Sequence, residues 1–143
     1  MMRSAIVAAA RGWIGTPYHH QASRKGVGCD CLGLVRGVWR ELVGPEPERM
    51  PAYTPDWAEA AGTETLLEGA ARHFVPVAHE DARAGDVLVF RWKAGTPAKH
   101  VGICAGDTFV HAYDSAGRVV EGALCPVWRR KLAAAFRFPG VTD

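Results

Sequence analysis

The sequence predicts an α+β fold, in which helices come first and an antiparallel sheet follows. Apolar residues in one early segment step by three, four and three positions, as a buried helix face requires: Leu32, Val35, Trp39 and Leu42. From Gly85 onward the apolar spacing becomes strand-like, with Gly, Pro and Asp turns between the segments. Helices followed by a meander of strands are typical of α+β proteins.

The elements follow in order along the chain. The first helix is expected from Ser4 to about Trp13. The second begins near Asp30–Cys31 and is ended by Gly44-Pro45, and the third covers residues 66–74. The segment 45–63 is rich in Pro, Glu and Gly, which predicts a long surface loop. The strand candidates are Val87–Trp92, His100–Ala105, Phe109–Tyr113, Arg118–Glu121 and Ala134–Phe138.

Length and composition indicate one globular domain covering residues 1–143. The chain has 143 residues, of which 48% are hydrophobic and 22% charged, values close to the average for folded soluble proteins. No apolar run approaches the roughly 18 residues of a membrane span. The N-terminus has no signal-peptide pattern, so we expect synthesis in the cytoplasm and reduced cysteines.

Charge is unevenly distributed along the chain. The net charge is only +2, which gives no reason to expect a nucleic-acid partner. Residues 1–45 carry six Lys/Arg and two Asp/Glu, residues 46–82 carry two and eight, and residues 83–143 carry nine and five. The region of about 45–82 is therefore expected to be an acidic insert of loop and helix between two basic flanks.

Cys31 is the candidate nucleophile, because it falls in the first turn of a predicted helix. The free N–H groups and the positive dipole end of that turn stabilise a thiolate. We therefore expect the pKa of the Cys31 thiol to lie below its usual value of about 8.5. Asp30 is a good N-cap, and Gly33 leaves room for a group to approach. Cys29 precedes the cap; the alternative for Cys31 is a small core residue.

Two histidines are expected to face each other on the sheet. A hairpin with Gly106-Asp107 at its tip pairs residues whose numbers sum to 213. His100 and His111 then share a strand face as diagonal neighbours, roughly 7–8 Å apart at the backbone. A cysteine with two adjacent histidines can act as nucleophile, base and orienting group.

The other cysteines and histidines suggest less. Cys29, Cys31, His100 and His111 are all legitimate zinc ligands, but their spacing is not that of common zinc sites, and we predict no metal. Cys104 and Cys125 are expected to be packing residues, and His19 and His20 to be solvent-exposed.

Five motifs together resemble the NlpC family of bacterial cell-wall cysteine peptidases. The family pattern is Gly-Thr-Pro-Tyr, Asp-Cys-Ser-Gly-Leu-Val, Gly-Asp-Leu-Val-Phe, His-Val-Gly-Ile, and a hydrophobic pair followed by His-Ala. The matching segments occur in family order and cover nearly the whole chain: Gly15–Tyr18, Asp30–Val35, Gly85–Phe90, His100–Ile103 and Phe109–Ala112.

The resemblance implies a papain-like fold, with N-terminal helices packed on a five- or six-stranded antiparallel sheet. It assigns Cys31 as nucleophile, His100 as base and His111 as the residue that orients the base. Tyr18 would lie beside the thiol, where it and Asp30 would contact substrate or the oxyanion. No metal or organic cofactor is implied. The substrate would be the peptidoglycan stem peptide, cut between D-glutamate, through its γ-carboxyl, and diaminopimelate.

The sequence departs from the family pattern at two places that bear on substrate specificity, and two segments suggest how the enzyme reaches the cell wall. Leu32 replaces the family Ser, and His19-His20-Gln21 follows Tyr18 where a Gly-Gly pair is common. Residues 28–40 and 53–57 resemble stand-alone peptidases encoded among the tail genes of phages and gene transfer agents. We therefore predict a peptidoglycan endopeptidase that a phage-like tail or baseplate carries to the cell wall. The alternatives are an inactive tail structural module, and a cell-wall amidase that uses the same residues.

Overall fold

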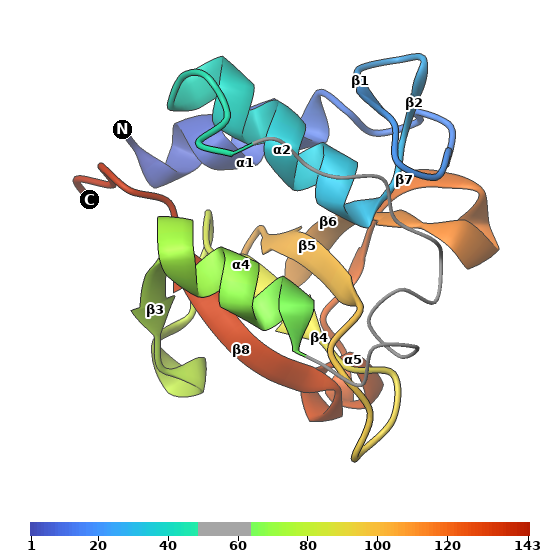
Figure 1. Cartoon of the computed structure of the whole chain (residues 1–143), viewed down its shortest axis with the longest axis vertical. Helices are drawn as coiled ribbons and strands as arrows, with labels where there is room; N and C mark the ends of the chain where they lie inside the picture. Colours follow the sequence, from blue (N-terminus) through green and yellow to red (C-terminus); the bar gives the residue numbers. More distant parts are fainter. Residues whose placement is uncertain (49–63) are drawn as a thin grey trace.

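Three helices lie against one face of a six-stranded antiparallel sheet in the computed structural model, which describes residues 1–48 and 64–143 (Figure 1). The helices on this face are α1 (Arg3–Arg11), α2 (Cys31–Leu42) and α4 (Thr65–His73). The strands are β3 (Val75–Val77), β4 (Val87–Phe90), β5 (His100–Cys104), β6 (Thr108–Tyr113), β7 (Arg118–Ala123) and β8 (Leu132–Arg137). A short hairpin of β1 (Ser23–Arg24) and β2 (Gly28–Cys29) precedes α2.

The sheet has the order β3-β8-β4-β5-β6-β7, and every neighbouring pair is antiparallel. The α+β layout is therefore confirmed, and the sheet has the larger of the two sizes, five or six strands, that the family resemblance implied. All five strand candidates form strands. The sixth strand, β3, was not expected, because it is three residues long and contains Pro76.

The helix predictions hold with small shifts at their ends. Asp30 caps α2 as expected, whereas α1 begins at Arg3, one residue before the predicted start, and its N-cap Met2 makes no side-chain hydrogen bond. Three short helices in the described residues were not predicted: α5 (Pro126–Arg130) and the 3₁₀ turns η1 (His79–Asp81) and η2 (Asp114–Ala116). The motif 53–57 lies outside the described residues, and so does the predicted loop 45–63 apart from residues 45–48.

The main core fills the space between the helices and the sheet. Leu34 and Val38 of α2 are fully buried there against Val101 and Ile103 of β5. Each fully buried aliphatic side chain contributes about 1.5–3 kcal/mol at most. This burial holds α2, and with it the N-terminal turn that carries Cys31, over the middle of the sheet.

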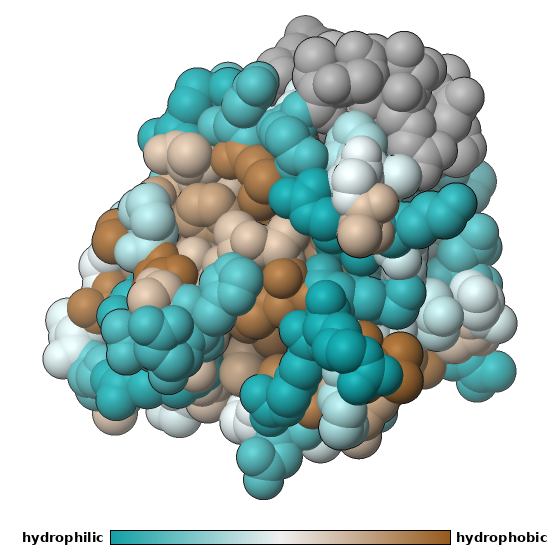
Figure 2. Space-filling view, turned by 90° about the horizontal axis from the view of Figure 1, so that it is seen from below, coloured by the Kyte–Doolittle hydropathy of each residue, from teal (hydrophilic) through white to brown (hydrophobic). Residues whose placement is uncertain are grey.

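A second, smaller core lies on the opposite face of the sheet. Phe90, Cys104 and Phe109 are buried there beneath Trp128 of α5. Figure 2 shows the molecule from below, where hydrophobic residues (brown) remain visible between hydrophilic ones (teal). Cys104 is a packing residue, as predicted, whereas Cys125 is only half-buried at the N-cap of α5.

A buried carboxylate joins the first helix to the sheet. Asp86, which is fully buried, accepts hydrogen bonds at 3.0 Å from the guanidinium groups of Arg3 on α1 and Arg137 on β8. Removing one partner of such a buried pair typically costs about 3–5 kcal/mol. None of the helices within residues 1–48 and 64–143 has the length and apolar run that a membrane crossing requires.

Gly33 permits a close backbone contact and does not have the role expected from the sequence. It was expected to leave room near the thiol, but its α-carbon faces the carbonyl of Ala22 in the preceding loop. A Cβ at residue 33 would overlap that carbonyl oxygen. The glycine therefore allows the loop before α2 to pack against the first turn of the helix.

Gly33→Ala should lower the free energy of unfolding by about 1–3 kcal/mol, because neither backbone segment can move easily. Urea unfolding would measure the change. Gly69→Ala in α4 is the matched control, since the nearest atom there is the flexible end of Arg72, 3.6 Å away. The control should be neutral or stabilising by up to about 1 kcal/mol. Equal effects of the two substitutions would contradict the packing argument.

Candidate active site

A cleft of about 500 Å³ opens where β5 begins, β6 ends and the N-terminus of α2 meets the sheet. Four of the five residues to which the resemblance assigned a role line it, and the fifth, His111, is hydrogen-bonded to His100. The lining residues are Tyr18, His20, Asp30, Cys31, Leu32, Leu66, Trp92, Lys99, His100, Ala112, Tyr113, Asp114 and Ser115.

Asp30 fixes the start of the helix that carries the thiol. It is 3% exposed; its Oδ1 accepts the N–H of Gly33 and its Oδ2 that of Gln21, both at 2.8 Å. The first bond is the predicted N-cap, and the second ties the loop after Tyr18 to the helix. A carboxylate cannot stabilise an oxyanion, so of the roles expected for Asp30 only a contact with a cationic or N–H group of the substrate stays a prediction.

The Cys31 thiol is a neutral donor in the resting structure. Its Sγ donates to the Lys99 carbonyl oxygen at 3.8 Å. Part of the residue is exposed, but its sulfur lies out of bulk water, and this burial, together with the charge of Asp30, raises the thiol pKa to about 12. The N–H groups of Val101, Leu32 and Cys31 act in the opposite direction. The depressed pKa expected from the sequence is therefore wrong, because burial outweighs the helix N-terminus.

His100 and His111 form a hydrogen-bonded pair. Nε2 of His100 lies 2.8 Å from Nδ1 of His111, and the two residues are 3% and 2% exposed. The predicted register is confirmed, since Cys104 pairs with Phe109 and Ile103 with Val110. Burial lowers the pKa of His100 well below its usual value, and that of His111 to about 4. Both rings are thus neutral at pH 7.

Aromatic rings hold the histidines in place. Trp92 stacks on His100 with ring centroids 4.9 Å apart, and Trp128 lies 5.7 Å from His100. Phe109 stacks on His111 at 4.1 Å. Neither tryptophan was expected at the site from the sequence, because Trp128 comes from an unpredicted helix and Trp92 was predicted to end a strand.

Tyr18 lies on the thiol side of the cleft, as expected. Its N–H donates to the carbonyl of Gly117, and its chain forms a bridge with Cys29, which precedes the helix. Burial, with a smaller effect of the nearby Cys31 sulfur, raises its pKa, so the hydroxyl stays protonated and can donate. His19 is exposed as predicted, but His20 is not: its Nδ1 lies 4.0 Å from Oδ2 of Asp30 on the cleft wall.

The zinc alternative finds no geometric support in the described part of the chain. No group of three or more His, Cys, Asp or Glu side chains is arranged there to hold a metal ion. Cys29 is fully buried in the main core, whereas His100 and His111 project from the opposite face of the sheet.

A helix with a cysteine in its first turn, packed on an antiparallel sheet that carries a histidine pair, is the arrangement of a papain-like fold. The NlpC/P60 family model matches residues 15–137. The chain belongs to the NlpC/P60 family.

Similar proteins span several bacteria. The murein DD-endopeptidase MepS/murein LD-carboxypeptidase of Escherichia coli K12 is 31% identical over 137 residues, which are 95% of this chain and 63% of that protein. The gamma-DL-glutamyl hydrolase of Bacillus subtilis is 29% identical over 96% of this chain and 30% of its own length. The chain thus spans less than two thirds of either relative.

Two solved structures share the fold. The NlpC/p60 domain of the peptidoglycan hydrolase SagA superposes with a TM-score of 0.62 at 27% identity, covering 96% of this chain and all of that chain. An NlpC/P60 family protein of Bacillus cereus gives a TM-score of 0.70 at 20% identity, over 96% of this chain and 40% of its own.

The thiol pKa values predict an unusual order of alkylation. In a limiting dose of iodoacetamide at pH 7, half-buried Cys125 should react first, because the N–H groups of Trp128 and Val127 lower its pKa. Cys31 should react slowly and accelerate as the pH rises toward 12. Peptide mapping would measure both rates.

A Cys125→Ser variant serves as the control, and the pH dependence of Cys31 labelling should be the same in it. If Cys31 were labelled faster than Cys125 below pH 7, and its labelling rate were independent of pH in that range, the thiolate and an imidazolium would instead coexist at rest.

Proposed function

We propose that this protein is a cysteine endopeptidase that hydrolyses peptidoglycan stem peptides, with Cys31 as nucleophile, His100 as base and His111 as orienting residue. The observation that carries the proposal is the cleft, whose lining includes both the helix-borne Cys31 and His100, with His111 hydrogen-bonded to His100. Relatives named as a murein endopeptidase and a gamma-DL-glutamyl hydrolase support this substrate class.

The histidine pair determines which nitrogen acts as the base. Nε2 of His100 is engaged by Nδ1 of His111, so Nδ1 of His100 is left to take the thiol proton. That requires neutral His100 to carry its proton on Nε2 and to donate it to His111, which accepts through Nδ1. His111 thereby fixes the tautomer and stabilises the imidazolium that forms.

The reaction then proceeds in two halves. As the thiol proton passes to Nδ1 of His100, the Cys31 sulfur attacks the substrate carbonyl, and the oxyanion is stabilised by the N–H of Cys31 and the hydroxyl of Tyr18. The C–N bond breaks, and the leaving amine takes the proton from His100. Water, deprotonated by His100, next hydrolyses the thioester and restores the thiol.

The resting pKa values suit this general-base route. Proton transfer accompanies attack, and the base must be unprotonated to begin. Because the pKa of His100 lies well below its usual 6.5, the base stays available through mildly acidic pH. The acid limb of the activity profile therefore belongs below pH 6.5.

The scissile bond within the stem peptide is proposed to be that between D-glutamate, through its γ-carboxyl, and diaminopimelate. The name of the Bacillus subtilis relative favours a γ-glutamyl bond. Cleavage at the sugar–peptide junction would use the same residues, and an inactive structural module would cleave nothing.

Purified muropeptides digested and read by mass spectrometry separate these possibilities. The wild-type chain should release peptides that begin with diaminopimelate; Cys31→Ala should release none, and His100→Ala almost none. His111→Ala should lose about 10²–10⁴-fold in kcat, and His111→Asn, which keeps an acceptor near Nε2, should lose less. Release of intact stem peptides from the sugar would identify an amidase, and no turnover would contradict the proposal.

Delivery by a phage-like tail is the finer part of the proposal. Its support is the resemblance of residues 28–40 and 53–57 to tail-associated peptidases and the acidic insert between basic flanks. The second motif lies outside the described residues.

The chain should co-purify with tail or baseplate proteins from particle-producing cells, in a fixed ratio to them. Gradient sedimentation followed by quantitative mass spectrometry would measure that ratio, with a cytosolic enzyme of the same cells as the control. Recovery of the chain only in the free-protein fractions would contradict tail delivery and leave the peptidase proposal standing.

A further inference from the structure

The strand order places the cleft residues in a sequence from one end of the cleft to the other. Trp92 follows β4 and Lys99 precedes β5, whereas Asp114 and Ser115 follow β6. Since the sheet runs β4-β5-β6-β7, Trp92 and Lys99 occupy one end of the cleft and Asp114 the other. The segment that carries Tyr18 pairs with the start of β7, so it lies at the Asp114 end.

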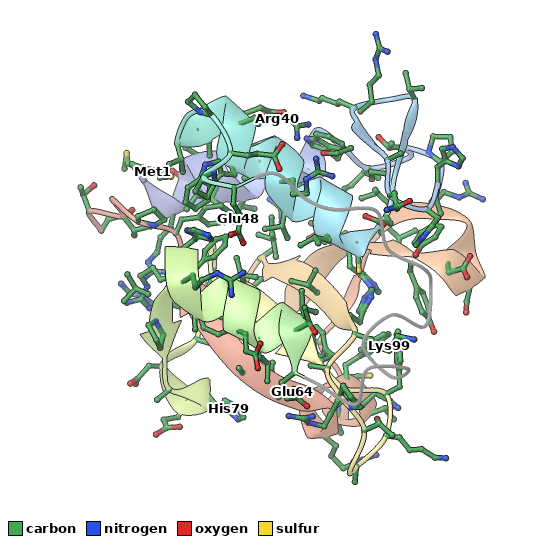
Figure 3. The ribbon with its side chains drawn as sticks, viewed as in Figure 1. Met1, Arg40, Glu48, Glu64, His79 and Lys99 are labelled. Atoms are coloured by element: carbon green, nitrogen blue, oxygen red, sulfur yellow. The ribbon has the colours of Figure 1, made fainter. Side chains whose placement is uncertain are left out.

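The two ends differ in charge. Asp114 lies at one end and Asp30 beside the thiol, and Lys99 is the one Lys or Arg side chain among the described residues that line the cleft. Figure 3 shows Lys99 on the same side of the molecule as Glu64, whose carboxylate forms an ion pair with Arg91 at 2.7 Å. The cleft therefore has a basic side chain at the Lys99 end and an acidic side chain at the Asp114 end.

The chemistry decides which end takes the leaving group. His100 must deliver its proton to the departing nitrogen, so the leaving residue lies beside this ring. His100 follows Lys99 in the chain and stacks on Trp92. The acyl part of the substrate then extends past the thiol toward Tyr18 and Asp30.

The structure assigns Lys99 and Trp92 to the leaving-group subsite, where the Lys99 ammonium selects an amine-side residue that carries a side-chain carboxylate. This assignment rests on the proposed function and adds the residue that recognises the leaving group of the substrate. Such a carboxylate would lie against the Trp92 ring and form a charge-assisted hydrogen bond with Lys99.

The backbone around both residues is held in place. The N–H of Lys99 donates to the Phe90 carbonyl at 3.1 Å, and its own carbonyl accepts the Cys31 thiol. The carbonyl of Trp92 accepts Nζ of Lys131 at 2.8 Å. Both side chains therefore extend from fixed points, which a specificity contact needs.

Two synthetic substrates test the assignment, L-Ala-γ-D-Glu-meso-diaminopimelate and L-Ala-γ-D-Glu-L-Lys, which differ in the distal carboxylate of the leaving residue. The wild-type chain should favour the diaminopimelate peptide in kcat/KM by about tenfold, the value of one hydrogen bond to a charged group. Lys99→Met should reduce this ratio to about one, mainly through KM. Lys93→Met, an exposed lysine outside the cleft lining, should leave the ratio unchanged.

Binding to an inactive chain gives a second readout that needs no turnover. The Kd values of both peptides would be measured by calorimetry for Cys31→Ala and for Cys31→Ala combined with Lys99→Met, and the preference should again depend on Lys99. A preference that survives Lys99→Met in both readouts overturns the assignment. Failure of the wild-type chain to cleave either peptide overturns the proposed peptidase bond, and the Kd ratio still decides the role of Lys99.

Discussion

The structure of the site depends first on the Asp30 carboxylate. Its two oxygens bind the first turn of α2 and the loop that follows Tyr18, so one side chain fixes both walls on the thiol side of the cleft. The close contact of Gly33 with the Ala22 carbonyl depends on the same arrangement. The negative charge of Asp30 also opposes ionisation of the neighbouring Cys31 thiol. The residue that positions the helix start therefore disfavours the thiolate at rest.

The aromatic rings around the histidines likewise disfavour the charged form of a site residue. Trp92, Trp128 and Phe109 exclude water from His100 and His111, and both rings are neutral at rest. In the proposed mechanism, charge develops only when the proton moves from the Cys31 sulfur to His100. In so dry an environment, fixed dipoles such as the N–H groups of Val101 and Leu32 act strongly on that new charge. On the proposed mechanism, the site would stabilise the charges of the reaction, whereas its resting groups are neutral.

Sequence reasoning predicted the local features and failed on those that tertiary packing decides. The Asp30 cap and the Gly106-Asp107 turn depend on neighbouring residues, and the turn alone fixes the register of His100 and His111. The sign of the Cys31 pKa shift depends on burial, which no local pattern encodes. Trp128 and His20 reach the site through an unpredicted helix and a loop, and β3 becomes a strand only because β8 lies beside it.

The two edge strands of the sheet have a consequence for aggregation. A sheet that ends in bare strands invites pairing with other chains and aggregation. Here one outer strand, β3, contains Pro76, which offers no N–H to an incoming strand. At the other edge, Gly15 and Thr16 already hydrogen-bond with Val119 of β7. Both margins of the sheet are thus partly closed, which favours a protein that stays monodisperse where many copies gather at high local concentration.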